Sequence, residues 1–308
     1  MSLELRTYLT SQTGNRYYLT LAKAKNLEMR LARCNEAYEA LRAGEKPSVE
    51  LVKFVRELGR ELLRLTKKPN FFSSEGQHKM EASNKASKGL LMSFVMHLAP
   101  ANSSGFQVCP WASLGCIKSC LNLAGHGPIV NVQAGRVKRT KLYFECRSVF
   151  CLLLWDQLDR MSRRKYKYAI RLNGTSDLAW ETREPWIFSM FPGHIFYDYT
   201  KSAARARRPK PHNYHLTFSR SETNHKQALD LLSRGVNVAI VFDYETWQQV
   251  TTDGTWNGYH VTDGSADDRR FLDKPGVVAL KPLGPAVQDD SGFVLRDSLR
   301  IIDQGVAA

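Results

Sequence analysis

Two runs of apolar residues at helical spacing occupy the first 70 residues. The first run extends from Tyr17 to Leu41, and the second begins at Pro47-Ser48 and continues to Leu65. Recurrence every three or four residues places such side chains on one face of a helix. The segment between the runs, residues 43–46 (AGEK), has the composition of a turn. We therefore expect residues 1–70 to form an N-terminal helical hairpin.

After a polar stretch at residues 70–88 without a clear period, the chain carries seven short apolar runs rich in β-favouring residues. Each run ends in polar residues, and most are followed by a helical segment; residues 130–164 predict one or two helices. Strands that alternate with helices are typical of a parallel sheet with crossover helices. The runs are Leu90–Leu98, Tyr168–Leu172, Ile195–Tyr199, Tyr214–Phe218, Val236–Phe242, Tyr259–Thr262 and Val277–Leu280.

This pattern indicates a fold class. Seven strand candidates over about 190 residues favour a partial or distorted (β/α) barrel over an open doubly wound sheet. Neither a glycine-rich dinucleotide fingerprint nor a phosphate-loop pattern follows the first run, which weakens the open-sheet alternative. We expect an α/β protein in two parts, a helical arm at residues 1–70 and a (β/α) partial-barrel domain at residues 71–308.

The most informative segment is residues 109–120, CPWASLGCIKSC, which holds three of the six cysteines. Such crowding in an intracellular protein indicates metal ligation more often than disulfides, although chance clustering of buried thiols is an alternative. Three thiolates with an open fourth position suit an iron–sulfur cluster. A zinc site needs a fourth ligand, for which His126, Cys146 and Cys151 are candidates. Cys146 and Cys151 fall on different faces of a helical pattern, so we expect them, like Cys34, to pack in the core. The expected metal ligands are Cys109, Cys116 and Cys120.

Polar residues follow the strand candidates. A barrel enzyme places its chemistry at the carboxyl ends of its strands. Taken singly, each of these residues is most simply a turn or cap residue. Together they bring lysines and carboxylates to one rim beside the cysteines, where opposite charges shift each other's pKa and form acid/base or anion-binding groups. We expect catalytic roles for Asp177, Lys201, Asp263 and Lys281, and ligand-binding roles for Asn173, Ser176, Asp198, Ser219 and Glu222.

The charge of the chain indicates an anionic partner. The 44 Lys+Arg exceed the 30 Asp+Glu, which gives a net charge of +14. Residues 1–70 contain 14 Lys+Arg against 8 Asp+Glu, and a second basic group lies in KSAARARRPKPH at residues 201–212. Nucleic acid is the usual partner of such a protein, and a solvated basic surface is the alternative. We expect contact with DNA or RNA through the N-terminal arm and the Arg205–Lys210 loop.

Composition also limits the cellular setting. With 43% hydrophobic residues, the chain can build a core and is not wholly disordered. Its longest apolar runs, such as VFCLLLW at residues 149–155, are far shorter than the roughly 20 residues that a bilayer requires. The N-terminus, MSLELRTYLT, lacks the pattern of a signal peptide. We expect a cytoplasmic protein without a membrane partner.

Several segments, taken in order, resemble the gene product 88 family of phage and mobile-element proteins. They are CPWASLGCIKSCLNLAGHG, RLNGTSDLAWE, FYDYTK, YHLTFSRSE, VAIVF, VTDGSADDRRFLD and GVVALKPLGPA, and they span about residues 88–294. The resemblance implies a phage or mobile-element protein in the host cytoplasm and leaves the N-terminal hairpin uncovered. Because the function of this family is largely unassigned, it implies no activity.

A looser similarity extends to radical S-adenosylmethionine enzymes, which also carry a three-cysteine loop after the first strand of a partial barrel. Carried over by position, it implies that Cys109, Cys116 and Cys120 hold a [4Fe–4S] cluster whose fourth iron binds S-adenosylmethionine. The spacing here is C-x6-C-x3-C, whereas most of that superfamily uses C-x3-C-x2-C. Residues 173–177 occupy the place of the glycine-rich segment that contacts the cofactor there.

The sequence leaves two functions open. The first is a radical-SAM-like iron–sulfur enzyme that acts on a nucleotide or nucleic acid. The second is a replication-related nucleic-acid-binding protein with a structural metal or none. A zinc hydrolase or deaminase is disfavoured, because the chain contains neither H-E-x-x-H nor H-x-E with a downstream P-C-x-x-C.

Overall fold

The helical hairpin predicted at the N-terminus is present. The computed structural model describes residues 21–67, 69–73, 84–85 and 91–296 of the 308-residue chain. Helix α2 (Leu21–Arg42) and helix α3 (Val49–Leu63) are joined by a short turn. Ser48 caps α3, because its Oγ accepts a hydrogen bond from the Leu51 N–H at 3.2 Å. Residues 1–20 of the predicted arm and most of the predicted linker at 70–88 lie outside the described residues.

All seven predicted strands belong to one sheet of nine strands, which confirms the α/β class. The order is β1-β2-β3-β4-β5-β6-β9-β8-β7. Neighbouring strands from β2 to β8 are parallel, whereas β1 and β7 pair antiparallel at the two edges. The strands are β1 (Phe72–Ser73), β2 (Leu91–Met96), β3 (Lys167–Arg171), β4 (Ile195–Thr200), β5 (Tyr214–Ser219), β6 (Val238–Val241), β7 (Thr255–Trp256), β8 (Tyr259–Asp263) and β9 (Val277–Leu280).

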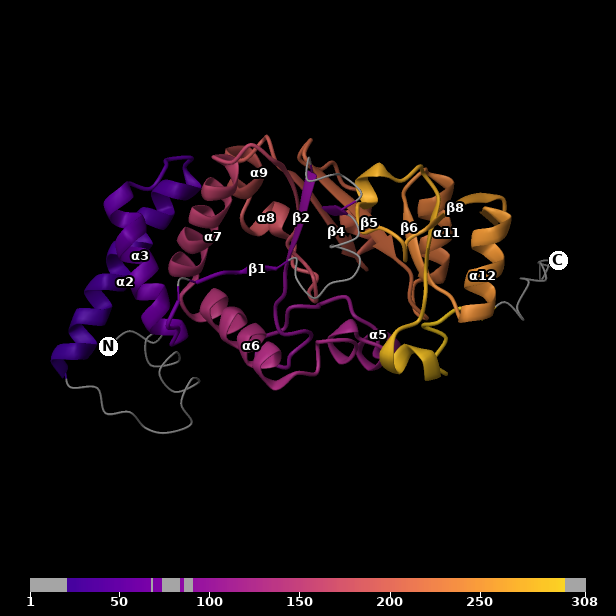
Figure 1. The fold of residues 1–308 in the computed structure, drawn as a ribbon, viewed down its shortest axis with the longest axis horizontal. Coiled ribbons are helices and arrows are strands. Elements are labelled where there is room, and N and C mark those ends of the chain that lie inside the picture. The colour runs from indigo at the N-terminus through magenta and orange to yellow at the C-terminus, as the bar shows by residue number, and fades with distance from the viewer. Residues whose placement is uncertain (1–20, 68, 74–83, 86–90, 297–308) are drawn as a thin grey trace.

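Helices lie in the connections between the parallel strands (Figure 1). The region predicted to hold one or two helices at 130–164 holds two, which meet at Cys146. The helical elements after α3 are α5 (Leu114–Lys118), η1 (Leu121–Leu123), α6 (Val130–Glu145), α7 (Arg147–Ser162), α8 (Trp180–Arg183), α9 (Trp186–Met190), α10 (Ala203–Arg207), α11 (His225–Ser233), α12 (Tyr244–Asp253), η2 (Arg270–Leu272) and η3 (Gly284–Gln288).

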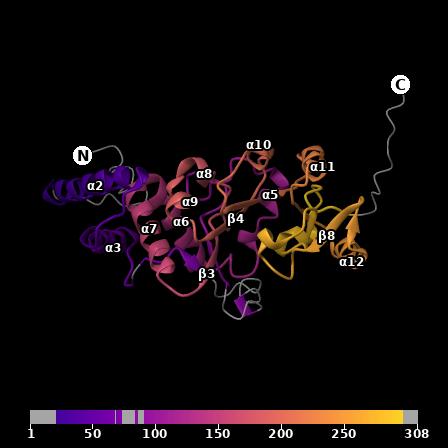
Figure 2. The ribbon, with the colours of Figure 1, turned by 90° about the horizontal axis from the view of Figure 1, so that it is seen from above.

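The hydrophobic core lies on one face of the sheet. One large cluster joins α2, α3 and α7 to alternate residues of β2–β5, and a second joins α10–α12 to β5, β6, β8 and β9. Seen from above, α7 lies between the hairpin and the strands (Figure 2). The hairpin therefore shares the main core, and its Tyr38 hydroxyl donates to the buried Glu184 carboxylate at 2.8 Å. Cys34, Cys146 and Cys151 are buried in this core, as predicted.

The opposite face of the sheet carries smaller and more polar side chains. Val95, Ala169 and Tyr197 form a minor apolar cluster there. The loop after β8 crosses this face, because its Asp268 accepts a hydrogen bond from the Tyr197 hydroxyl at 3.0 Å and pairs with Arg171 at 3.5 Å. Among the described residues, no strand pairing joins the β1 end of the sheet to the β7 end. No helix in the described part is long and apolar enough to cross a bilayer.

Candidate functional site

The cysteine loop lies over the carboxyl ends of the parallel strands. It leaves the end of β2, yet it is fastened to the end of β5 by Glu222, whose carboxylate accepts hydrogen bonds from Ser113 Oγ and the Gly115 N–H, both at 2.8 Å. Gly115 has no room for a side chain, since a Cβ atom there would collide with Glu222. On the far side, Cys116 packs against the segment that contains η3 (Figure 1). The loop therefore bridges distant parts of the sheet edge.

Glu222→Ala is expected to loosen this loop. The change leaves the Gly115 N–H and the Ser113 hydroxyl without their acceptor, at a cost of about 1–3 kcal/mol to the local structure. Amide hydrogen exchange should therefore accelerate across residues 113–120. Glu245→Ala, which removes an exposed carboxylate on α12, is the control and should leave exchange in the loop unchanged. Equal exchange rates in wild type and Glu222→Ala would show that the carboxylate does not hold the loop.

All three loop cysteines are free thiols. Two of the sulfurs accept backbone hydrogen bonds, Cys109 from the Ala101 N–H at 3.3 Å and Cys120 from the Asn122 N–H at 3.5 Å. Burial, together with a smaller effect of negative charge on Cys120 and Cys116, raises the pKa of Cys109 to about 12. Burial and negative charge on Cys116 raise the pKa of Cys120, whereas the positive charges of Arg136 and Lys201 lower it. The three thiols are thus close enough to influence one another, and cations lie nearby.

The donor set of this loop fits a thiolate-bound metal cluster. Three free thiols on one segment, N–H···S hydrogen bonds and neighbouring cations are features that stabilise iron–sulfur ligation. As the side chains stand, no group of three or more His, Cys, Asp or Glu residues in the described part of the chain is arranged to hold a metal ion. His126 is exposed on the same loop, whereas Cys146 and Cys151 lie in the core and are not placed to serve as a fourth ligand.

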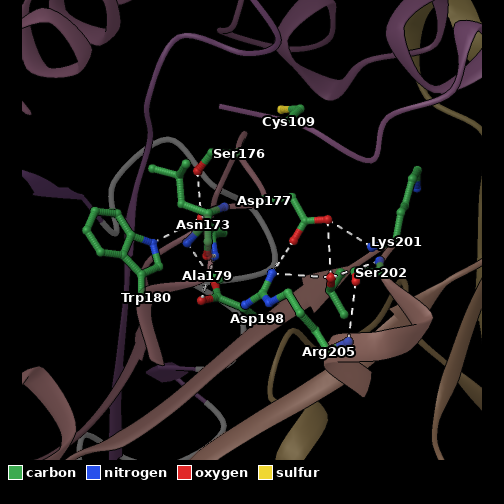
Figure 3. A network of polar contacts seen from close by, with 12 residues as sticks. Cys109, Asn173, Ser176, Asp177, Ala179, Trp180, Asp198, Lys201, Ser202 and Arg205 are labelled. Atoms are coloured by element: carbon green, nitrogen blue, oxygen red, sulfur yellow. Dashed lines mark hydrogen bonds and ion pairs between the residues drawn. The ribbon is translucent and has the colours of Figure 1, made fainter. Parts of the chain in front are cut away.

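A buried hydrogen-bonded network holds the segment after β3 (Figure 3). Asn173, which is 2% exposed, accepts hydrogen bonds at its Oδ1 from Ser176 Oγ, the Leu178 N–H and Trp180 Nε1, at 2.8–3.0 Å. Asp198 at the end of β4 accepts from the Asn173 N–H at 2.7 Å and from Asn173 Nδ2 at 3.1 Å. The structure brings together Asn173, Ser176 and Asp198, all predicted to bind a ligand. Their polar atoms already bond to one another, which gives them a positioning role.

Asp198 should make stability depend on pH. Burial raises its pKa to about 7, from 3.8 for an ordinary aspartate. Because the folded state binds this proton more tightly than the unfolded state, the contribution of Asp198 to stability falls as pH rises from about 4 to about 7 and stays low above that range. Asp198→Asn should reduce the difference in unfolding free energy between about pH 5 and about pH 7.5, measured by urea denaturation. An unchanged difference would contradict this assignment.

Asp177 and Lys201 lie beside the cysteine loop. Asp177 is buried. Its carboxylate accepts hydrogen bonds from the Lys201 N–H at 2.9 Å and from Thr200 Oγ1 at 3.2 Å, and it pairs with Arg205. Burial raises the pKa of Asp177, and the positive charges of Arg205 and Lys201 reduce this increase. The Lys201 ammonium donates to Ser219 Oγ at 2.7 Å. In Figure 3, the Cys109 sulfur lies on the Asp177 side of this network. Asp177, Lys201 and Ser219 thus meet at the rim, as predicted.

The other two predicted catalytic residues make different contacts. Asp263 accepts a hydrogen bond from the Ser265 N–H at 2.8 Å within a turn. The Lys281 ammonium lies 3.8 Å from the centre of the Trp247 ring and 5.7 Å from that of Tyr244, both on α12. Neither contact involves the cysteine loop. Arg136, whose charge lowers the pKa of Cys120, is not among the predicted site residues, because it lies on helix α6 and not at the end of a strand.

The cations of the Arg205–Lys210 loop, expected to contact DNA or RNA, also bind groups of the protein itself. Arg205 is 4% exposed and its guanidinium is bound between Asp177 and Glu181, at 2.7 Å from the latter. Arg207 forms an exposed ion pair with Asp230 at 2.8 Å. The Lys210 ammonium donates to two backbone carbonyls of its own segment at 2.8 Å. Three of the four cations at positions 205–210 therefore bind groups within the protein.

These features define a class of protein: a largely parallel α/β sheet with its helices against one face and a three-cysteine loop over the carboxyl ends of its strands. The family model for gene product 88 matches residues 65–297, and the chain belongs to this family. The match begins just after α3, so it includes the sheet and the cysteine loop and leaves the hairpin outside, as the resemblance predicted. No curated protein and no solved structure matches the chain, so the comparisons add no support to the similarity with radical S-adenosylmethionine enzymes.

Proposed function

We propose that this protein is an iron–sulfur enzyme in which Cys109, Cys116 and Cys120 hold a [4Fe–4S] cluster with one iron open to S-adenosylmethionine. The substrate is a nucleotide or nucleic acid. One observation carries the proposal: three free thiols share a loop that is fastened over the carboxyl ends of parallel strands. In sheets of this type, ligands bind at that edge.

A partial-barrel shape is part of this proposal. Strands β2 to β6 are in sequence order, and the two main apolar clusters lie on one face of the sheet, as they do outside a barrel. Strand β8 is four strands away from β4 in the sheet, which is about 19 Å across a flat sheet. The five Cα–Cα steps from Asp263 to Asp268 span at most about 17 Å, yet Asp268 reaches the Tyr197 hydroxyl. Curling of the sheet towards this face makes that contact easier to reach.

Each part of the site has a separate task. Cys109, Cys116 and Cys120 would hold the cluster, which, once reduced, would supply one electron for the cleavage of a bound sulfonium such as S-adenosylmethionine. The backbone N–H groups of Ala101 and Asn122 stabilise the thiolates of Cys109 and Cys120. Lys201, held by Ser219, offsets negative charge at Cys120. Asp177 fixes the Lys201 backbone and so sets where this ammonium enters the site.

The nucleotide or nucleic-acid substrate is supported by charge. The net charge of +14 favours anionic ligands in general, and cations at the cysteine loop give that preference a location. The alternative, a nucleic-acid-binding protein without a cluster, gains no specific support, because the basic groups proposed for it are partly used within the protein.

The test uses anaerobically reconstituted and reduced protein. Addition of S-adenosylmethionine should change the electron paramagnetic resonance spectrum of the reduced cluster, and methionine should be released when the cofactor is cleaved. A loaded cluster whose spectrum ignores S-adenosylmethionine would refute the enzymatic part and leave cluster binding intact. Salt-dependent DNA or RNA binding that persists in the triple variant Cys109→Ala/Cys116→Ala/Cys120→Ala, with no cluster in wild type, would favour the alternative.

A further inference from the structure

Helix α6 carries two arginines beside the cysteine loop, near the carboxyl end of β2. Arg136 is 7% exposed, and its guanidinium donates from Nη1 to the Asn122 side-chain oxygen. Its Nε is buried and has no hydrogen-bond partner among the described residues. Arg139, three residues along the helix, donates from Nε to the His97 carbonyl oxygen at 3.0 Å. The contacts of both guanidinium groups in the described part of the chain are to neutral oxygens, and no carboxylate affects either pKa.

Arg136 is buried, and Arg139 is half-buried beside it. Burial lowers the pKa of Arg136, and burial together with Arg136 lowers the pKa of Arg139 to about 10. Burial and the charges of Arg136, Arg171 and Arg139 lower the pKa of His97 to about 3, so His97 is neutral at physiological pH. Arg171 has a counter-ion in Asp268. Negative charge on Cys120 raises the pKa of Arg136, but no carboxylate pairs with Arg136 or Arg139 in the described part of the chain. A buried guanidinium without a paired carboxylate is unfavourable, so Arg136 and its half-buried neighbour Arg139 suit an anion supplied by a ligand.

We propose that Arg136 and Arg139 form an oxyanion site that binds the phosphate or carboxylate group of a ligand beside the cysteine loop. A guanidinium offers parallel N–H donors that match either group. Asn122 joins the site to the cysteines, because its side chain accepts from Arg136 and its backbone N–H donates to Cys120. The inference deepens the proposed function by specifying an anionic group on the ligand, and it rests on the arginines without requiring the cluster.

Two matched ligand pairs test the site by isothermal titration calorimetry. AMP and adenosine differ by a phosphate, and methionine and its methyl ester differ by a carboxylate. In at least one pair, the anionic member should bind about tenfold or more tightly than its neutral partner. A preference for AMP identifies phosphate as the bound group, and a preference for methionine identifies carboxylate; each supports the site. No preference in either pair would overturn the proposal.

Variants connect the preference to the arginines. Arg136→Gln/Arg139→Gln should abolish it, whereas Lys138→Gln, a charge removal between them on the same helix, should retain it. Arg139→Gln alone should lower it several-fold, which keeps the test available if the double variant does not fold. In anion-free buffer the folded double variant should melt above wild type, because an uncompensated buried charge is removed. Anion preference that survives in these variants, or a double variant that melts below wild type, would overturn the proposal.

The same titrations in the Cys109→Ala/Cys116→Ala/Cys120→Ala variant separate this inference from the cluster. Anion preference retained there, with no iron in wild type, would uphold the oxyanion site and refute the proposed function. Loss of the preference in that variant alone would show that the arginines compensate the charge of the thiolates or of a cluster, and would overturn the inference.

Discussion

Single replacement of Cys109, Cys116 or Cys120 by alanine is expected to reduce bound iron from about four per chain to a small fraction of that value. Each thiolate holds one iron of the proposed cluster, and no spare thiol lies on the loop to replace it. The visible absorbance of the cluster should disappear together with the iron. The measurement is iron and acid-labile sulfide per chain after anaerobic reconstitution.

Cys34→Ala is the matched control for these variants. Cys34 is a free thiol that is fully buried in α2, within the core shared with α7. Its replacement removes one sulfur and leaves the loop intact, so iron and sulfide should remain at the wild-type level. Full iron retention in all three loop variants would contradict the assignment of the ligands, as would equal loss in Cys34→Ala.

Arg205→Ala is expected to destabilise the fold by about 3–5 kcal/mol, because it leaves buried carboxylates without their counter-ion. Arg205 is 4% exposed and pairs with both Asp177 and Glu181, whose side chains are 11% and 13% exposed. The loss should appear as a lower midpoint of urea unfolding followed by circular dichroism. The effect extends to the site, since Asp177 also binds the Lys201 backbone.

Arg207→Ala provides the comparison for Arg205. It lies on the same short helix and removes the same group, but its ion pair with Asp230 is exposed, with side-chain exposures of 45% and 36%. Pairs of this kind contribute about 0–1 kcal/mol. A loss for Arg205→Ala no greater than that for Arg207→Ala would mean that the buried pairs do not stabilise the connection between β3 and β4.

The parallel strands were predictable because each lies in a short run rich in β-favouring apolar and aromatic residues, bounded by polar residues. Strands buried on at least one face require such runs. The edge strands β1 and β7 have two residues each, which is too short for any alternation to be recognised. Their pairing depends on contacts with β2 and β8 that are set by the fold as a whole.

The polar residues at the carboxyl ends of the strands were predictable to a similar degree. Reading the ends of parallel strands identified Asp177, Lys201 and Ser219, which do meet, and Glu222, which fastens the loop. The same rule does not say which way a side chain points. Side chains alternate between the two faces of a strand, and Val277 and Ala279 of β9 face the core that contains α12. Lys281, two residues after Ala279, follows the same alternation, and its ammonium packs against rings of α12.

Tertiary partners explain what the sequence could not reveal. Asp198 is occupied by Asn173 and by the Tyr214 hydroxyl at 3.0 Å, which comes from the neighbouring strand. Arg205, expected to contact a nucleic acid, instead pairs with carboxylates 24 and 28 positions earlier in the chain. Arg136 and Arg139 belong to helix α6 and not to a strand end, so only the packing of α6 beside Asn122 and His97 reveals them.

Iron and sulfide analysis of anaerobically purified wild-type protein, paired with its visible spectrum, is the most direct test of the central claim. The account predicts a brown protein with about four irons and four sulfides per chain. A colourless protein without iron after anaerobic reconstitution, or one that holds only zinc, would contradict the claim that these three cysteines bind an iron–sulfur cluster.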